Sequence, residues 1–371
     1  MKKFSLWIST IVIIFTCNGQ LLGSEPRIVA SIKPIHSLAS AIMVGVGSPA
    51  LLVKGIESPH TYQLIPSDAK IIENADVLLW IGPSLEPTLA ASISSLAKDK
   101  KVIELSKTSG LVLLPNREAP GAHGHGHGHD DEHGHDDEHG HDDEHGHEDE
   151  HGHEDEHGHE DEHGHEDEHG HEDEHGHEDE QESEGSDEKE GHGMLHDMHI
   201  WLDIGNAKVM AQEIAVTLQN VFPEYQNEFE TNLNNVLPRL DALETELQKQ
   251  AEPFAGSPYV VFHDAYQYLE KKLDLNNVGA VTANVERTPG VKRISELRQT
   301  IIDTGAVCVF SEPQFDAKIL QTITEGTELR SGELDPLGAG VGEGPEAYFE
   351  IMRNMVSTLQ KCLNPVPTES G

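Results

Sequence analysis

Histidine is the residue type whose placement in this sequence most directly suggests a chemistry. Twenty of the 26 histidines crowd into residues 123–177, and four others, His36, His60, His199 and His263, stand in segments that read as folded. His263 directly follows the apolar run YVVF, whereas His60 and His199 lie in SPHTYQ and DMHIWLD. Ligands of open α/β sheets bind at the carboxyl ends of the strands. Three imidazoles meeting there would suit Zn²⁺, which prefers nitrogen and sulfur ligands in a tetrahedral arrangement.

The elements that would position these residues are predicted in two α/β lobes. Residues 24–117 contain the apolar runs 27–32, 75–81 and 101–105, with helical patterns between them. Residues 257–371 have the same style, with YVVFH and AVCVF as buried strands and VKRISELRQTIID as an amphipathic helix. Continuous apolar runs are typical of buried parallel strands. The predicted class is therefore α/β, each lobe a parallel-type sheet with flanking helices.

The segment between the lobes reads as helical. Residues 196–205 are interpreted as a return to the N-terminal lobe, and residues 206–256 as connecting helices. From 224 to 250 the apolar residues follow a 3.6-residue period, although Pro238 should kink that helix. A long helix between two α/β lobes would be a stiff connector.

Residues 118–195 form an insert of a different kind. The unit GHDDEH, later GHEDEH, recurs every six residues, and almost no apolar side chain is present. Such a segment cannot offset the entropy of folding and is predicted to be disordered without ligand. Its imidazoles and carboxylates could form many overlapping metal sites without preformed geometry, each weaker than the three-histidine site. The alternative is a solvated acidic linker, but charge alone would not require histidine.

Charge excludes two classes of partner. Of the formal charge of −42, −31 falls within residues 123–190, and the rest of the chain carries −11. An acidic chain of this kind favours cations over nucleic acid or anionic membranes. No segment after the N-terminus has about 18 consecutive apolar residues, so no membrane span is expected.

The N-terminus and the cysteines indicate the compartment. Two lysines, a largely apolar run of ten residues and a small polar stretch over residues 1–23 have the layout of a cleaved signal peptide, which predicts a periplasmic protein. Lipidation at Cys17 is an alternative, although Thr16 is a poor residue before such a cysteine. The remaining pair, Cys308 and Cys362, favours a disulfide in an exported chain, with two buried free thiols as the alternative.

Six segments in order resemble one protein family. These are SIKPIHSLAS, HTYQLIPSDAKIIENADVLLWIGPSLE, DMHIWLD, FHDAYQYLEKK, FSEPQF and LDPLG. Together they are similar to the cluster A-I family of metal-binding solute-binding proteins, and within it to the zinc-binding subunits of high-affinity zinc importers that carry a His-rich loop. The resemblance spans nearly all of the mature chain. It implies two α/β lobes, a rigid connecting helix, a metal in the cleft and a disulfide between Cys308 and Cys362.

The resemblance also implies a ligand set. The metal histidines of the family fall on His60, His199 and His263, and Asp335 or a water would be the fourth ligand. Some zinc relatives use a glutamate just before the first histidine, but that position is Pro59 here. Manganese relatives have a carboxylate in place of His263, so the imidazole shifts the preference towards Zn²⁺. Asp264 is a candidate acceptor for the N–H of a ligand imidazole, and His36 is interpreted as a packed or surface residue.

The function expected is that of a monomeric, non-enzymatic solute-binding protein. It would capture Zn²⁺ with high affinity and deliver it to the permease and ATPase subunits of an ABC-type zinc importer, with the insert as a secondary low-affinity collector. Manganese or nickel binding by the same fold is one alternative. A periplasmic zinc hydrolase is another, but no HExxH motif is present. A third is an adhesin or zinc buffer that acts through the insert.

Overall fold

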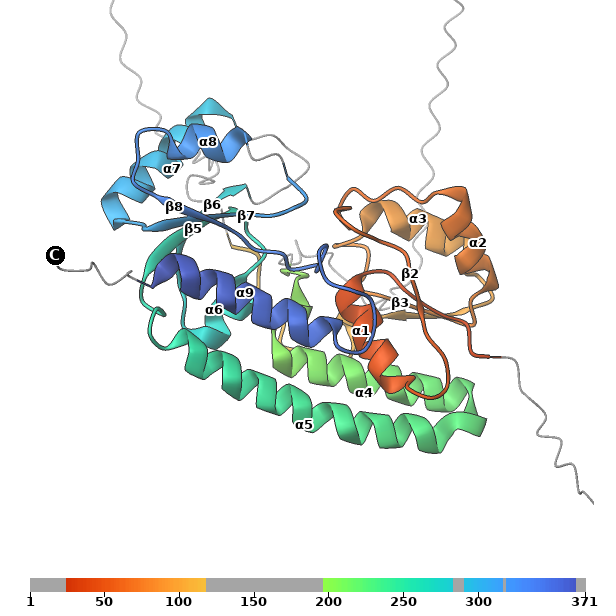
Figure 1. Ribbon diagram of the computed structural model, residues 1–371. Coiled ribbons are helices and arrows are strands. Elements are labelled where there is room, and N and C mark those ends of the chain that lie inside the picture. Colours follow the sequence, from red (N-terminus) through yellow and green to blue (C-terminus); the bar gives the residue numbers. More distant parts are fainter. Residues whose placement is uncertain (1–24, 118–195, 283–289, 316–317, 365–371) are drawn as a thin grey trace, which may run out of the picture. The chain divides into compact units, whose positions relative to one another are not determined.

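The computed structural model describes residues 25–117, 196–282, 290–315 and 318–364 (Figure 1). They belong to one compact unit of the chain. The predicted signal peptide (1–23) and the His-rich insert (118–195) lie outside the described residues.

The N-terminal lobe contains a four-stranded parallel sheet with the strand order β2-β1-β3-β4. Its elements follow one another as β1 (Ile28–Ala30), α1 (Lys33–Ile42), β2 (Ala50–Leu51), α2 (Pro66–Asn74), β3 (Val77–Trp80), α3 (Pro87–Leu96), β4 (Lys101–Glu104) and the 3-10 turn η1 (Leu105–Lys107). Strands β1 and β3 are buried throughout, as their apolar runs predicted. The register places the carboxyl ends of all four strands at one edge of the sheet.

The C-terminal lobe has a second four-stranded parallel sheet, with the order β6-β5-β7-β8. Its elements are β5 (Pro258–His263), α6 (Gln267–Leu273), β6 (Asn276–Thr282), α7 (Val291–Thr304), β7 (Cys308–Ser311), α8 (Lys318–Thr324), β8 (Arg330–Glu333) and α9 (Ala347–Leu363). Side chains of β5 alternate between two cores: Tyr259 and Val261 join the large core with α9, and Val260 and Phe262 join a smaller one with α7. The predicted α/β class with two parallel sheets is confirmed.

Two long helices connect the sheets. The chain passes from η2 (Ile200–Leu202) into α4 (Ile204–Val221), then through η3 (Pro223–Tyr225) into α5 (Gln226–Ala251). Helix α5 continues past Pro238 and contacts α1 of the first lobe, α4 and α9. In Figure 1 it runs along the side of α4 and ends beneath the second sheet. Since α1 also packs against α9, the two lobes share one hydrophobic core.

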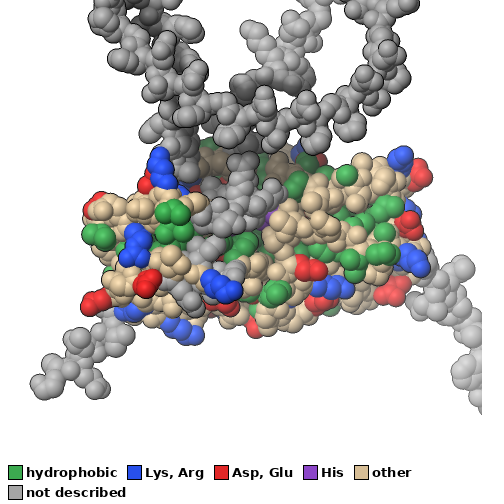
Figure 2. Space-filling model, turned by 90° about the horizontal axis from the view of Figure 1, so that it is seen from above, with side chains coloured by type: hydrophobic (Ala, Val, Ile, Leu, Met, Phe, Trp, Pro, Cys, Tyr) green, Lys and Arg blue, Asp and Glu red, His purple; other side chains and the backbone are tan. Residues whose placement is uncertain are grey.

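Some elements have bounds that the apolar runs do not mark. Helix α1 begins at Lys33, because Pro34 is accommodated in a first turn, and it ends at Ile42. The edge strand β8 has the polar sequence RSGE, so no apolar run marked it. Among the described residues, no helix is both long and apolar enough to cross a bilayer. On the face in Figure 2, basic and acidic side chains are interspersed.

Candidate metal centre

Three histidines from distant parts of the sequence meet in one place. His60 lies in the loop between β2 and α2, His199 directly precedes η2, and His263 is the last residue of β5. Their ring centroids are 5.4 Å (His60–His199), 5.3 Å (His60–His263) and 4.9 Å (His199–His263) apart. One ring nitrogen of each lies within 4.8 Å of the others, which is the spacing of atoms that could hold one metal ion. The strand-end position predicted for His263 is confirmed.

Two of the imidazoles lie against buried carboxylates. Nδ1 of His199 lies 2.7 Å from Oδ1 of Asp197, which also accepts the backbone N–H of His199 at 2.9 Å. Nδ1 of His263 lies 3.3 Å from Oε1 of Glu312, although not in hydrogen-bonding geometry. Since these contacts involve Nδ1, Nε2 is the nitrogen that remains for a metal on His199 and His263.

Electrostatics favour a neutral ring at His60. Burial, followed by the proximity of His199 and His263, lowers the pKa of the His60 imidazole well below its ordinary value, although a hydrogen bond with the Leu85 backbone opposes the shift. Burial also acts to raise the pKa of the Asp197 carboxyl, but the interactions with His199 outweigh it and the pKa lies below its ordinary value. A neutral imidazole is the form that binds metal.

The histidines line a small pocket with a volume of about 10 Å³. The other lining residues are Ser58, Pro59, Trp201, Glu312, Gln314, Phe315, Pro336 and Leu337. Trp201 Nε1 donates to the carbonyl of Pro336 at 3.0 Å, and the buried ammonium of Lys33 donates to the carbonyls of Gly338 and Val341. These bonds fix the loop after β8 against the first lobe, so this part of the pocket lining is held in place.

Asp335 stands apart from the three imidazoles. Its Oδ1 accepts the N–H of Gly338 at 2.8 Å and its Oδ2 lies 3.4 Å from the N–H of Gly340. Asp335 is not among the residues that line the pocket, nor in the group of possible ligand atoms. In this conformation its carboxylate stabilises the turn that follows Pro336.

Two other expectations have different outcomes. Asp264 does not accept from a ligand imidazole; its carboxylate pairs with Arg117, whose Nη1 also lies 2.7 Å from Oε2 of Glu270. His36 is packed within α1, with Nε2 3.0 Å from the carbonyl of Pro49, and takes no part in the histidine group.

The predicted disulfide is present. Cys308 in β7 and Cys362 in α9 are bonded, and both side chains are buried. The bond ties the last helix to the second sheet.

Three polar residues of the pocket region were not predicted from the sequence. Asp197, Glu312 and Gln314 were all within quoted segments, DMHIWLD and FSEPQF, yet no role was assigned to them. Asp197 could have been found from its place two residues before a histidine, a spacing that allows a carboxylate to reach the same ring. No local sequence pattern marks Glu312 and Gln314, because their position at the pocket depends on the packing of β7 beside β5.

Comparison with known proteins gives a consistent family. The profile of the family described as "ZnuA: Zinc-uptake complex component A periplasmic" matches residues 28–362. The "High-affinity zinc uptake system protein ZnuA" of Brucella suis biovar 1 is 41% identical over 360 residues, which cover 97% of this chain and 98% of the relative. The protein of the same name from Yersinia pestis is 30% identical, with 92% of each chain covered.

Solved structures share the fold. A ZnuA deletion mutant crystallised with zinc bound has a TM-score of 0.64 at 19% identity, covering 92% of this chain and 99% of its own. The periplasmic zinc-binding protein TroA of Treponema pallidum has a TM-score of 0.63 at 17% identity, covering 91% and 99%.

Proposed function

Because this chain belongs to the family of periplasmic zinc-uptake component A proteins, we propose that it captures Zn²⁺ between three imidazoles and hands the ion to a zinc importer in the membrane. The ligands in this proposal are His60, His199 and His263. The observation that carries it is the approach of one ring nitrogen from each to within 4.8 Å of the others. Imidazole nitrogen is a preferred ligand of Zn²⁺, and a hard ion such as Mn²⁺ would call for more oxygen.

Charge supports a divalent cargo. The carboxylates of Asp197 and Glu312 are 5% and 4% exposed and lie against His199 and His263. Neither has a lysine or arginine partner among the ion pairs of the described residues. A dication held by three neutral rings would be balanced by two such carboxylates, so the surroundings favour M²⁺ over a monovalent ion.

The fourth ligand in this proposal is a water, with Asp335 as the alternative. Asp335 already accepts from Gly338 and has a second contact with Gly340, so binding metal would cost it those interactions. Zinc sites with three protein ligands commonly complete their tetrahedron with water. An Asp335→Asn variant should therefore keep its zinc affinity within a few-fold of the unchanged protein, whereas a direct ligand would lose more.

Transport rather than catalysis is proposed for the bound ion. Relatives are named as zinc-uptake proteins and not as enzymes. Hydrolysis by zinc-bound water needs a free general base. Glu312, the carboxylate in the pocket, accepts from the Tyr266 hydroxyl at 2.9 Å and lies beside His263. We expect no turnover of esters, phosphates or β-lactams.

The remaining parts of the proposal come from the sequence. The chain would act as a periplasmic monomer after loss of residues 1–23, and deliver zinc to permease and ATPase subunits. Residues 118–195, outside the described part, would collect further zinc weakly through their 20 imidazoles in residues 123–177.

Zinc titration of three proteins tests this function. The full chain should bind one Zn²⁺ tightly and several weakly. Replacing residues 120–193 by a short Gly-Ser linker should remove the weak class alone; the pairing of Pro115 with His196 holds the ends of that segment together. His60→Ala should remove the tight class, whereas the control His36→Gln, which can still donate to the Pro49 carbonyl, should keep it. Tight binding that survives His60→Ala, or disappears with the insert, would overturn the proposal.

A further inference from the structure

The turn that follows β7 brings two polar residues to the pocket. The N–H of Phe315 donates to the carbonyl of Glu312 at 3.2 Å, which closes a four-residue turn with Pro313 and Gln314 in its centre. Phe315 anchors this turn, because its ring stacks on Phe262 with centroids 4.9 Å apart and meets the edge of His263 at 5.8 Å. The position of Gln314 is therefore set by the same packing that positions His263.

Gln314 has a buried amide without a partner. Its Oε1 and Nε2 are both inaccessible to solvent, and neither has a hydrogen-bond partner among the described residues. The other unpartnered buried side chains of the described residues each leave a single atom unpaired. Burying an amide unpaired is costly, so such a group indicates a partner that arrives from outside the protein.

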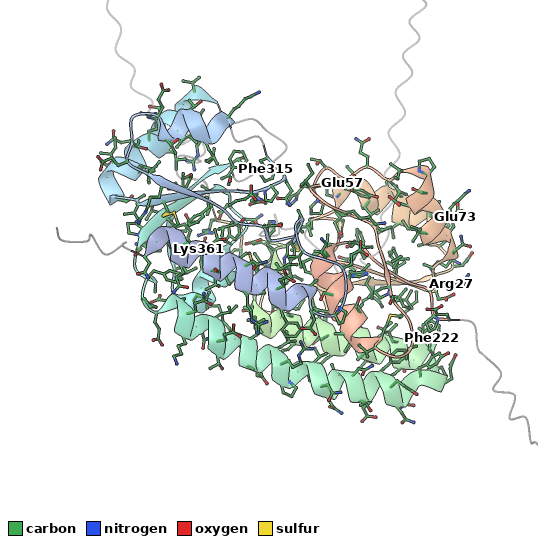
Figure 3. The ribbon with its side chains drawn as sticks, in the orientation of Figure 1. Arg27, Glu57, Glu73, Phe222, Phe315 and Lys361 are labelled. Atoms are coloured by element: carbon green, nitrogen blue, oxygen red, sulfur yellow. A yellow bond between two sulfur atoms is a disulfide. The ribbon has the colours of Figure 1, made fainter. Side chains whose placement is uncertain are left out.

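The location of Gln314 identifies where that partner would be. Gln314 lines the histidine pocket and also an outer groove beside it, which contains Glu57, Thr61 and Tyr62. Phe315 and Glu57, labelled in Figure 3, lie on the two sides of this groove. Apart from Ser58, Glu312 and Gln314, the other residues that line the pocket have side chains without an acceptor oxygen: Pro59, Trp201, Phe315, Pro336 and Leu337.

We propose that the amide of Gln314 holds the water that completes the coordination of the captured ion, and so acts as a positioning residue for zinc binding; this rests on the proposed function. A metal-bound water uses its oxygen for the metal and has two O–H groups to donate. Oε1 of Gln314 accepts one of them. An amide cannot take up the proton as a carboxylate can, so the water stays an exchangeable ligand and is not turned into a nucleophile.

Three variants of the full chain test this role. Gln314→Met keeps the shape of the side chain and removes both polar atoms. Gln314→Glu keeps an acceptor oxygen, and Gln63→Met is a matched control at an exposed position of the outer groove. The tight zinc affinity is measured by competition with a chelator, and the melting temperature is measured with and without zinc.

Gln314→Met is expected to weaken zinc binding without lowering the stability of the metal-free protein. Gln314→Met should weaken tight zinc binding by about 10–100-fold, the usual effect of losing a group that orients a metal ligand. Its metal-free melting temperature should equal or exceed that of the unchanged protein, because an unpaired buried amide has gone. Gln314→Glu and Gln63→Met should bind zinc within a few-fold of the unchanged protein.

Two results would overturn the proposal. One is Gln314→Met with unchanged tight affinity. The other is a loss of zinc affinity in both Gln314→Met and Gln314→Glu, together with a lower metal-free melting temperature. That combination would make Gln314 a structural residue. Failure of zinc capture itself would be recognised separately, because the unchanged protein and Gln63→Met would then lack the tight class as well.

Discussion

Asp197 holds His199 from two directions. Its Oδ1 lies 2.7 Å from the ring Nδ1 of His199 and 2.9 Å from the backbone nitrogen of the same residue. The backbone of Asp197 is itself fixed, since its N–H donates to the Leu114 carbonyl at 2.9 Å and its carbonyl accepts from the Tyr268 hydroxyl at 2.7 Å. Tyr268 belongs to α6 of the second lobe, so one residue joins the ring of His199 to both lobes.

Asp197→Asn should therefore weaken zinc binding more than it weakens the fold. The amide keeps the size of the side chain but loses the charge that fixes the ring and supports the bound cation. We expect the tight zinc affinity to fall by about 10–100-fold. Competition with a chelator measures it, and Asp241→Asn, which breaks an exposed ion pair with Lys208, is the control. Equal affinities for the two variants would show that Asp197 does not act through His199.

The sequence predicts the buried central strands of the sheets better than the polar edge strand β8. Strands β3 and β5 are buried throughout or nearly so, and burial on both faces produces the continuous apolar runs from which they were predicted. Strand β8 lies at the edge of its sheet and has two exposed residues among four, so its composition is that of a loop. The central strands of each sheet and the edge strand β4 were therefore predicted from their apolar runs, whereas the edge strand β8 was not.

Only part of the candidate site could be predicted from local sequence patterns. The strand-end rule predicted the position of His263, whereas His60 and His199 were assigned by family resemblance, because each lies in a loop. The partners of the imidazoles depend on tertiary packing that no local pattern encodes. Asp264, adjacent to His263, was the expected acceptor, yet its carboxylate turns to Arg117, while Glu312 approaches His263 from another strand.

Glu86 should make the stability of the metal-free protein depend on pH. Its carboxyl group is 1% exposed, with Oε2 accepting from the N–H groups of Ile81 and Gly82 and Oε1 unpartnered. Burial raises the pKa of Glu86 from 4.5 to about 7. The folded state then binds the proton more tightly than the unfolded state. The contribution of Glu86 to stability is highest below the unfolded pKa and is lost as pH rises towards 7, in total on the order of 3 kcal/mol.

Glu86→Gln removes this dependence, since the amide does not titrate and its oxygen can still accept from the two N–H groups. Urea unfolding of metal-free protein at several pH values between about 5 and 8 measures the free energy of unfolding. As pH rises, the free energy of unfolding of Glu86→Gln should increase relative to that of the unchanged protein. Glu73→Gln, at an exposed position of α2, should show the same pH dependence as the unchanged protein. Parallel pH profiles for Glu86→Gln and the unchanged protein would contradict the raised pKa.

Reduction of the bond between Cys308 and Cys362 should lower stability without affecting zinc capture. The two residues are separated by 54 positions, and closing a loop of that length stabilises by about 4 kcal/mol in the chain-entropy account. The melting temperature of the unchanged protein should fall on addition of a reductant, whereas that of a Cys308→Ala/Cys362→Ala variant should not respond. Two free thiols in native periplasmic protein would rule the bond out, and a loss of tight zinc binding on reduction would show that the bond also supports the site.

Acid should release zinc from the insert before it releases zinc from the histidine pocket. Protons compete with metal for each imidazole, and the unperturbed pKa of histidine is about 6.5. The insert is predicted to offer ligand sets without preformed geometry, so modest protonation should empty them. In the pocket, burial and the neighbouring rings lower the pKa of His60, so that protons compete for this ligand only at more acidic pH.

Between about pH 7.5 and about pH 5.5 the full chain should lose most of its weakly bound zinc while the tight ion stays. Zinc retained after dialysis measures this, and the protein with residues 120–193 replaced by a linker should retain its ion over the same range. Parallel loss from both proteins would mean that pocket and insert are not two separate sites.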